Sequence, residues 1–315
     1  MLAMGSALRI CSLLPSATEI VFALGLGDHL VAVTHECDFP PEAAERRVVT
    51  RSTLGHATRR SREVHHHIAS AAHRGSSVYT LDQKLLERLA PNLILTQELC
   101  DVCAVSYALV ENAVHRLSGQ PTVLSLEPTS LSGILETIKR VGEAAGVPRR
   151  AGALVAELQQ RIDRIAGLAQ TAQARPSVFA MEWLDPPFAA GHWIPEMIRL
   201  AGGRDDLARE GLPSAMIAWE GIVEYDPEIV VLMPCGFTAE RTIDELPDVE
   251  LPKGWDDLTA VRSGRVYAVN ASAYCSRPGP RIVEGLEILA EIIHPELFPR
   301  TMPREAWQRL EAEAA

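Results

Sequence analysis

The sequence has fewer basic than acidic residues and no long apolar run. Each of these two features excludes a class of protein. Lys and Arg number 30 against 41 Asp and Glu among 315 residues, which gives a formal net charge of -11. Nucleic-acid binding relies on clustered cations that displace counterions, so we expect no nucleic-acid partner. No apolar run approaches the roughly 18 residues of a membrane span, so we expect no membrane insertion.

Catalytic motifs and targeting signals are also missing. The sequence has no GxSxG elbow, no HExxH and no P-loop, which leaves hydrolytic catalysis without support and predicts a protein that is not an enzyme. The N-terminus "MLAMGSALRICSLLPSATEI" shows no basic segment, no clean apolar segment and no small-residue cleavage site. As it stands, the sequence predicts a cytoplasmic location. The alternative is a periplasmic or other extracytoplasmic location, if the sequence starts after a removed signal peptide.

The residues that are present favour a large α/β fold. Hydrophobic residues make up 47% and charged residues 23%, enough to bury the cores of two lobes. In the first 128 residues, short β-rich runs alternate with helical patterns, which predicts parallel βα units. The expected strands are "ALRICSLL", "LVAVTHE", "SVYTL", "LILTQ" and "TVLSL".

Two helices then interrupt this alternation. One spans 131–146, and the next starts at Pro148 and runs without a breaker to about Gln170, or roughly 35 Å, long enough to reach from one lobe to another. The β/α pattern resumes with "SVFAMEW", "IVVLM" and "RVYAVN". We therefore expect an N-terminal α/β lobe at 1–128, linker helices including the long bridging helix at 129–174, and a C-terminal α/β lobe at 175–315.

The two halves resemble each other weakly. "EIVFALGLGDHL" and "EMIRLAGGRDDL" both end a helix with glycines and an acid, and "PNLILTQELC" resembles "PEIVVLMPCG". This similarity suggests duplicated lobes, in which Cys100 and Cys235 follow equivalent strands. Ligands of open α/β sheets bind at the carboxyl ends of the strands, so both thiols would face the groove between the lobes.

Loops that follow the predicted strands carry the residues best suited to binding. They contain Pro, Gly, Cys, His, Trp or Arg where an ordinary connection uses Asn, Asp, Ser or Lys. Among them Trp183, Trp193 and Trp219 suit a large flat ligand, although core packing is the alternative, especially for Trp219. The triplet "HHH" at 65–67 fits a solvated helix face better than a metal site, because consecutive helical residues point in different directions.

The six cysteines leave several roles open. Cys11 lies inside a strand and fits a small apolar core residue, whereas Cys275 is ambiguous. Cys100 and Cys103 have the CxxC spacing of half a zinc or cluster site, or of a redox dithiol. With Cys37, His35 and Cys235 they complete a tetrahedral set, so Zn or Fe at Cys37, Cys100, Cys103 and Cys235 is one hypothesis and simple packing is another.

Motifs from residue 10 to about 295 resemble the helical-backbone solute-binding proteins of ABC importers, and within them the cobalamin-binding branch. The resemblance is carried by "SLLPSATEIVFALGLGD", "VTHECDFPPEA", "LILTQELCDVCAVS", "EWLDPPFAAGHWIPEM", "MPCGF", "AVRSGRVYAVN" and "SRPGPRIVEGLEILA". It implies two α/β lobes bridged by one long helix, a ligand in the intervening cleft, and a membrane permease as partner. It also implies that aromatic side chains embrace the corrinoid, with Tyr274 joining the three tryptophans.

The first hypothesis is a non-catalytic, monomeric binding protein for cobalamin or a related metal chelate, acting in ABC-type uptake. Its expected ligand-binding residues are Ser16, His35, Glu36, Trp183, His192, Trp193, Trp219, Tyr274, Arg277 and Arg281. The alternative is a cytoplasmic metal-binding or thiol-redox protein on the same fold that uses the four cysteines. A third reading is a protein with no small ligand, whose role is contact with a partner.

Overall fold

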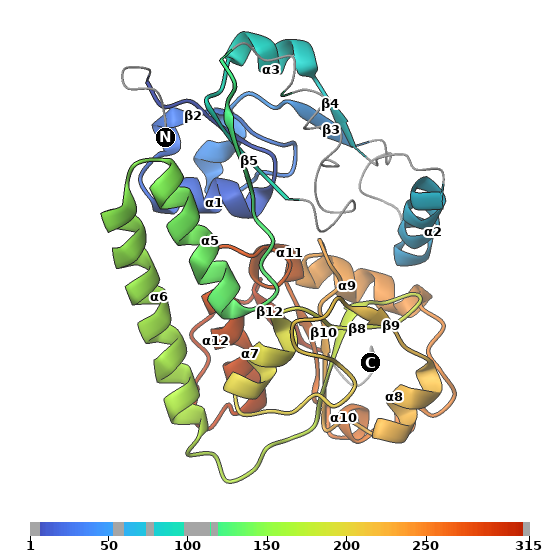
Figure 1. The fold of residues 1–315 in the computed structure, drawn as a ribbon. Helices are drawn as coiled ribbons and strands as arrows, with labels where there is room; N and C mark the ends of the chain where they lie inside the picture. The colour runs from blue at the N-terminus through green and yellow to red at the C-terminus, as the bar shows by residue number, and fades with distance from the viewer. Residues whose placement is uncertain (1–6, 53–59, 74–78, 98–113, 115–118, 311–315) are drawn as a thin grey trace. The chain divides into compact units, whose positions relative to one another are not determined.

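The computed structural model describes residues 7–52, 60–73, 79–97, 114 and 119–310 (Figure 1). Contacts within the chain divide it into two compact units. Unit 1 comprises Met1–Arg59, His66–Pro128 and Ser132–Glu157, and unit 2 comprises Arg60–His65, Thr129–Leu131 and Leu158–Ala315. The predicted α/β fold is confirmed, while the domain bounds at 1–128, 129–174 and 175–315 stay predictions.

The main sheet of unit 1 is parallel, as predicted. Its order is β2-β1-β5-β6. Its strands are β1 (Ile10–Ser12), β2 (Leu30–Ala32), β5 (Leu93–Thr96) and β6 (Thr122–Ser125). The run Leu93–Thr96 is buried throughout, which is typical of an interior parallel strand. Cys11 is also fully buried in this core, which confirms its predicted packing role.

One predicted strand pairs differently from the expectation. β4 (Tyr79–Leu81) does not join the parallel sheet but pairs antiparallel with β3 (Thr50–Ser52) in a separate two-stranded sheet. Tyr79 is buried and Thr80 exposed, so the strand has one wet face. Such alternation suits an antiparallel pair, whereas interior parallel strands are buried on both faces.

Helices complete unit 1, and α2, α5 and α6 each include residues of both units. The helical segments are α1 (Pro15–Ala23), η1 (Gly27–His29), η2 (Pro41–Glu45), α2 (Ser61–His73), α3 (Gln83–Leu89) and α5 (Leu131–Ala144). α6 (Pro148–Ala169) has 22 residues, and the division between the units falls at Glu157 and Leu158 within it. Its first residue is a proline, whose missing N–H costs nothing at a helix start. The predicted long helix is therefore confirmed.

The sheet of unit 2 has the order β12-β11-β10-β7-β8-β9. β7 (Val178–Trp183), β10 (Ile229–Leu232) and β11 (Val266–Val269) are parallel. The strands at either side are antiparallel to their neighbours: β8 (Phe188–Ala189), β9 (Ala215–Met216) and β12 (Trp307–Arg309). The three parallel strands contribute Phe179, Leu232 and Ala268 to one apolar core.

Helices pack around this sheet (Figure 1). They are α7 (Ile194–Leu200), α8 (Trp219–Tyr225), α9 (Ala239–Glu245), η3 (Leu246–Asp248), η4 (Trp255–Asp257), α10 (Thr259–Arg262), α11 (Ala271–Tyr274) and α12 (Ile282–Ile293). α7 contacts α12, while α9 lies against β11 and α10 against β10. Among the described residues, no helix is both long and apolar enough to cross a membrane.

The topology supports the predicted internal repeat. β1 pairs with β5 and β5 with β6, as β7 pairs with β10 and β10 with β11. α1 follows β1, and α7 follows β7 after the short strand β8. Each helix is followed by a glycine with a positive φ, Gly25 after α1 and Gly202 after α7. After α7, Arg204 forms an isolated parallel β-bridge with Ser177, the residue before β7. This bridge corresponds to the parallel pairing of β2 with β1. β5 and β10 are thus equivalent strands.

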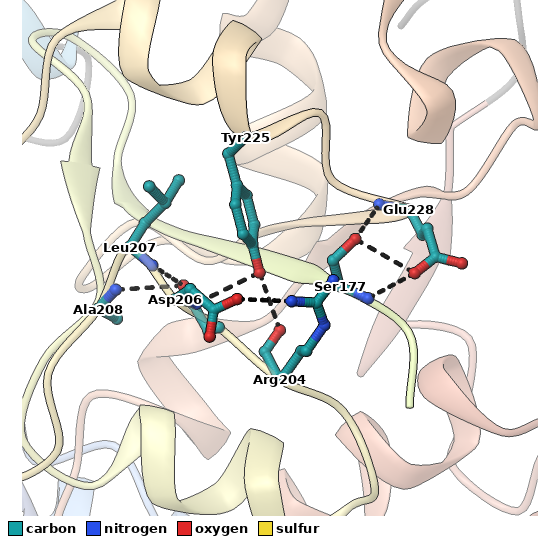
Figure 2. A network of polar contacts seen from close by, with 8 residues as sticks. Ser177, Arg204, Asp206, Leu207, Ala208, Tyr225 and Glu228 are labelled. Atoms are coloured by element: carbon teal, nitrogen blue, oxygen red, sulfur yellow. Dashed lines mark hydrogen bonds and ion pairs between the residues drawn. The ribbon is translucent and has the colours of Figure 1, made fainter. Parts of the chain in front are cut away.

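A polar network fixes the segment that follows α7 to the sheet of unit 2 (Figure 2). The Asp205 carboxylate accepts hydrogen bonds from the backbone N–H groups of Ala180 on β7 (3.3 Å), Leu207 (3.1 Å) and Ala208 (3.2 Å). The Tyr225 hydroxyl donates to the Arg204 carbonyl at 3.2 Å. Asp205 as a residue is partly buried, but its carboxyl group faces the interior, and this desolvation raises its pKa to about 7.

The raised pKa predicts a specific pH dependence of stability. Between about pH 4 and pH 7, Asp205 is protonated in the folded protein and ionised in the unfolded chain, so its contribution to the free energy of unfolding falls as pH rises, by ~1.4 kcal/mol per unit. Asp205→Asn cannot titrate, so the variant should gain stability relative to the wild type across this range. Denaturant unfolding at several pH values measures the difference.

Asp256→Asn is the matched control, because Asp256 is exposed and is not among the charges that shift the pKa of Asp205. It should leave the slope unchanged. Parallel pH profiles for Asp205→Asn and the wild type would contradict the assignment.

Candidate functional site

The loops at the carboxyl ends of β7, β10 and β11 gather most of the predicted binding residues in unit 2. Parallel strands end at the same sheet edge, so these loops are neighbours. Backbone hydrogen bonds confirm this: Cys235 N–H donates to the Glu182 carbonyl and Ser272 N–H to the Phe237 carbonyl, both at 3.0 Å. The edge therefore combines aromatic, cationic and thiol side chains from three separate chain segments.

Trp183, the last residue of β7, belongs to an aromatic group that continues on the next loop. Its ring meets Phe237 edge-on, with 5.4 Å between the centroids. The Arg241 guanidinium lies 3.6 Å from the centroid of the Phe237 ring, a cation–π contact. The indole N–H of Trp183 is buried and has no hydrogen-bond partner among the described residues. Phe237 and Arg241 were not among the residues chosen from the sequence.

His192 and Trp193 sit on a loop of tightly constrained backbone. His192 has φ +52°, its N–H donates to the Leu212 carbonyl at 2.6 Å, and its own carbonyl accepts from Gly211 N–H at 2.8 Å. The indole N–H of Trp193 donates to the Cys275 carbonyl at 2.9 Å, which ties this loop to the one after β11. Burial lowers the pKa of His192, so its imidazole is neutral at neutral pH.

The segment after β11, from α11 to the start of α12, supplies Tyr274 and the two predicted arginines. The Arg281 guanidinium lies 5.8 Å from the centroid of the Tyr274 ring, and Arg277 donates to the Ser272 hydroxyl at 3.4 Å. All three predicted residues are partly buried. The arrangement leaves charged groups next to an aromatic surface, a combination that suits a flat ligand with polar groups at its edge.

Trp219 has a different environment. It begins α8, packs against the apolar core of unit 2, and meets Trp255 edge-on with 6.0 Å between the ring centroids. This packing favours the core alternative for Trp219. Its role as a ligand contact stays a prediction.

In unit 1, the predicted polar residues form hydrogen-bonded groups of their own. The backbone N–H of His35 donates to the Thr50 hydroxyl at 3.1 Å, and the Tyr79 hydroxyl donates to Glu36 at 3.0 Å. His35 Nδ1 lies 2.8 Å from the same hydroxyl of Thr50. Burial lowers the pKa of His35, with Glu36 acting in the opposite direction. Ser16, in the first turn of α1, is buried.

Two of the four proposed metal ligands, Cys37 and Cys235, lie in the described part of the chain. Cys37 is buried, and its sulfur lies 3.0 Å from the Thr18 hydroxyl and 3.2 Å from that of Thr34. Cys100 and Cys103 lie outside the described residues, and Cys235 is partly buried. In the described ranges, no group of three or more His, Cys, Asp or Glu side chains could hold a metal ion. A cysteine metal site therefore stays a prediction.

Glu182 is the main residue that the sequence reasoning missed. It is the next-to-last residue of β7, and its carboxylate accepts a hydrogen bond from Gly191 N–H at 3.0 Å. Desolvation raises its pKa, while bonds from Gly191 and the Ser214 hydroxyl act in the opposite direction. The available signal was an acidic residue within the otherwise apolar run "SVFAMEW".

Comparisons with known proteins agree with this fold. The chain is 28% identical over 297 residues to the ABC transporter substrate-binding lipoprotein YvrC of Bacillus subtilis, covering 92% of this chain and 81% of the relative. It is 26% identical to the vitamin B12-binding protein of Vibrio cholerae, covering 89% and 86% of the two chains. A periplasmic haem-binding protein from Pseudomonas aeruginosa has the same fold, with a TM-score of 0.69, 21% identity, and coverage of 97% and 96%.

A family model described as periplasmic binding protein matches residues 10–273. Members of this family carry substrates without chemical change, which confirms the prediction of a protein that is not an enzyme. The family description supports the extracytoplasmic alternative and gives no support to the cytoplasmic location expected from the N-terminus. The resemblance seen in the sequence is confirmed: the chain belongs to the periplasmic binding protein family.

Proposed function

We propose that this protein binds cobalamin or a related flat metal chelate as the extracytoplasmic component of an ABC importer. The observation that carries the proposal is the aromatic and cationic surface at the carboxyl edge of the unit 2 sheet, where Trp183, Trp193 and Tyr274 come from two of the three loops. The name of the Vibrio cholerae relative supports cobalamin as the ligand.

The chemistry of these side chains suits a corrinoid. The indole N–H of Trp193 is already bonded to the Cys275 carbonyl, so the ring offers its apolar surface for stacking. Arg277 and Arg281 can donate to amide or phosphate oxygens at the edge of such a ligand.

Contacts from Ser16, His35 and Glu36 of unit 1, an ABC permease as partner, and a monomeric state also belong to this proposal. The family match and the substrate-binding relative support the permease. No observation favours the cytoplasmic metal or thiol-redox function, so it is not proposed here.

The proposal predicts different effects for two tryptophans. Trp193→Ala should weaken cobalamin binding about 10- to 100-fold, or ~1.4 to 3 kcal/mol, because it removes a stacking surface held at the ligand loops. Trp255→Phe, the control, should change affinity less than about twofold, since Trp255 is buried in the apolar core. Calorimetric titration measures both.

Wild-type protein with cobalamin at 100 times its dissociation constant should gain about 2.7 kcal/mol of stability. Haem is titrated in parallel to separate the two chelates. Binding of neither would sink the proposal, and tight binding of haem alone would replace cobalamin as the ligand.

The cysteines give a separate prediction. If they do not hold the ligand, the double variant Cys100→Ser, Cys103→Ser should bind cobalamin within about twofold of the wild type, because stacking and not ligation sets the affinity. Elemental analysis of protein purified without added metal should find no stoichiometric Zn or Fe. Stoichiometric metal that disappears in the double variant would support the cysteine site instead.

A further inference from the structure

A carboxyl group at the end of an apolar strand requires an explanation. The preceding residues of β7, Val178–Met181, are buried, and Glu182 continues this strand as a partly buried residue whose carboxyl is desolvated, which raises its pKa. Burying a polar group costs free energy unless hydrogen bonds compensate. The hydrogen bonds of this carboxyl must therefore offset the cost of its desolvation.

Glu182 connects segments that are distant in sequence. Its carboxylate accepts from Gly191 N–H at 3.0 Å and from the Ser214 hydroxyl, and its backbone carbonyl accepts from Cys235 N–H at 3.0 Å. One residue thus bonds to the loop before α7, to the segment before β9 and to the loop after β10. The first of these loops carries His192 and Trp193.

Gly191 lies directly against another backbone segment. A Cβ atom built at Gly191 would lie 2.2 Å from the Ser214 nitrogen and 2.6 Å from the Leu212 carbonyl oxygen, so the backbones touch directly. The next residue, His192, is held by two backbone hydrogen bonds to the same segment. The Glu182 carboxylate and the backbone of 211–214 therefore both contact the two residues that precede Trp193.

The surroundings of the carboxyl contain thiols. The Cys275 thiol is buried, and its pKa is raised first by desolvation and then by the proximity of Glu182 and Cys235. The carbonyl of Cys275 accepts the Trp193 indole N–H at 2.9 Å. Glu182 thus lies next to both anchors of Trp193: the Gly191 backbone and the Cys275 residue.

We infer that Glu182 is the positioning residue of the ligand site: its carboxyl, bonded to Gly191 and Ser214, sets the placement of the His192–Trp193 loop. The ligand part of this inference rests on the proposed function, whereas the loop part does not. Glu182 acts through Trp193 and needs no contact with the ligand.

The test compares three variants. Glu182→Ala removes both hydrogen bonds. Glu182→Gln keeps an oxygen for the Gly191 N–H and an amide for the Ser214 hydroxyl, and so should rescue the loop. Glu224→Gln, on the exposed part of α8, is the matched control for the loss of one carboxylate.

Two signals report on the loop without any ligand: hydrogen exchange of the Gly191 amide and the NMR resonance of the Trp193 indole N–H. Glu182→Ala should accelerate exchange at Gly191 at least about tenfold, shift the indole resonance, and weaken cobalamin binding about tenfold. Glu182→Gln and Glu224→Gln should stay within about threefold of the wild type in both measurements.

Unchanged signals in Glu182→Ala, or a Glu182→Gln variant as impaired as Glu182→Ala, would overturn the inference. If Glu182→Ala does not fold, Glu182→Asp replaces it, because a side chain shortened by one methylene keeps the charge but cannot reach Gly191. A wild type that binds neither cobalamin nor haem would refute the proposed function alone, since the Gly191 and Trp193 signals still decide the role of Glu182.

Discussion

Parallel pairing of β7, β10 and β11 is the constraint on which the rest of unit 2 depends. Because the three strands run in the same direction, their carboxyl ends meet at one edge, and loops from distant parts of the sequence become neighbours there. The contacts of Trp183 with Phe237 and of Trp193 with Cys275 follow from this arrangement. The packing of these buried strands thus determines where the polar and aromatic side chains of their loops come together.

Two acidic side chains anchor β7 to neighbouring segments. Asp205 bonds to the backbone of Ala180 from one neighbouring segment, and Glu182 extends from the strand itself to Gly191. Both carboxyl groups are desolvated, which raises their pKa values and reduces the stability that their hydrogen bonds provide. The protein therefore gives up some stability at this strand, and in return the strand is bonded to Gly191 and to the segment that carries Asp205.

Local signals explain what the sequence could predict. α6 could be predicted because it starts at a proline and continues without a helix breaker. β5 and β10 could be predicted because each is a short run of buried, mostly apolar residues. The partner of β4 is set by distant residues, so its antiparallel pairing was missed. For the same reason the sequence favoured core packing more for Trp219 than for Trp193 but could not identify Trp255 as its neighbour, nor Gly191 as the partner of Glu182.

The short antiparallel strands at the two sides of the unit 2 sheet have a consequence for association. β9 has two residues and β12 has three, so each outer edge offers few unpaired backbone groups to another molecule. If the sheet ended in a longer strand with unpaired N–H and C=O groups, that edge could pair with a strand of another chain. With these terminators the unit 2 sheet has little free edge at which another copy of the chain could pair.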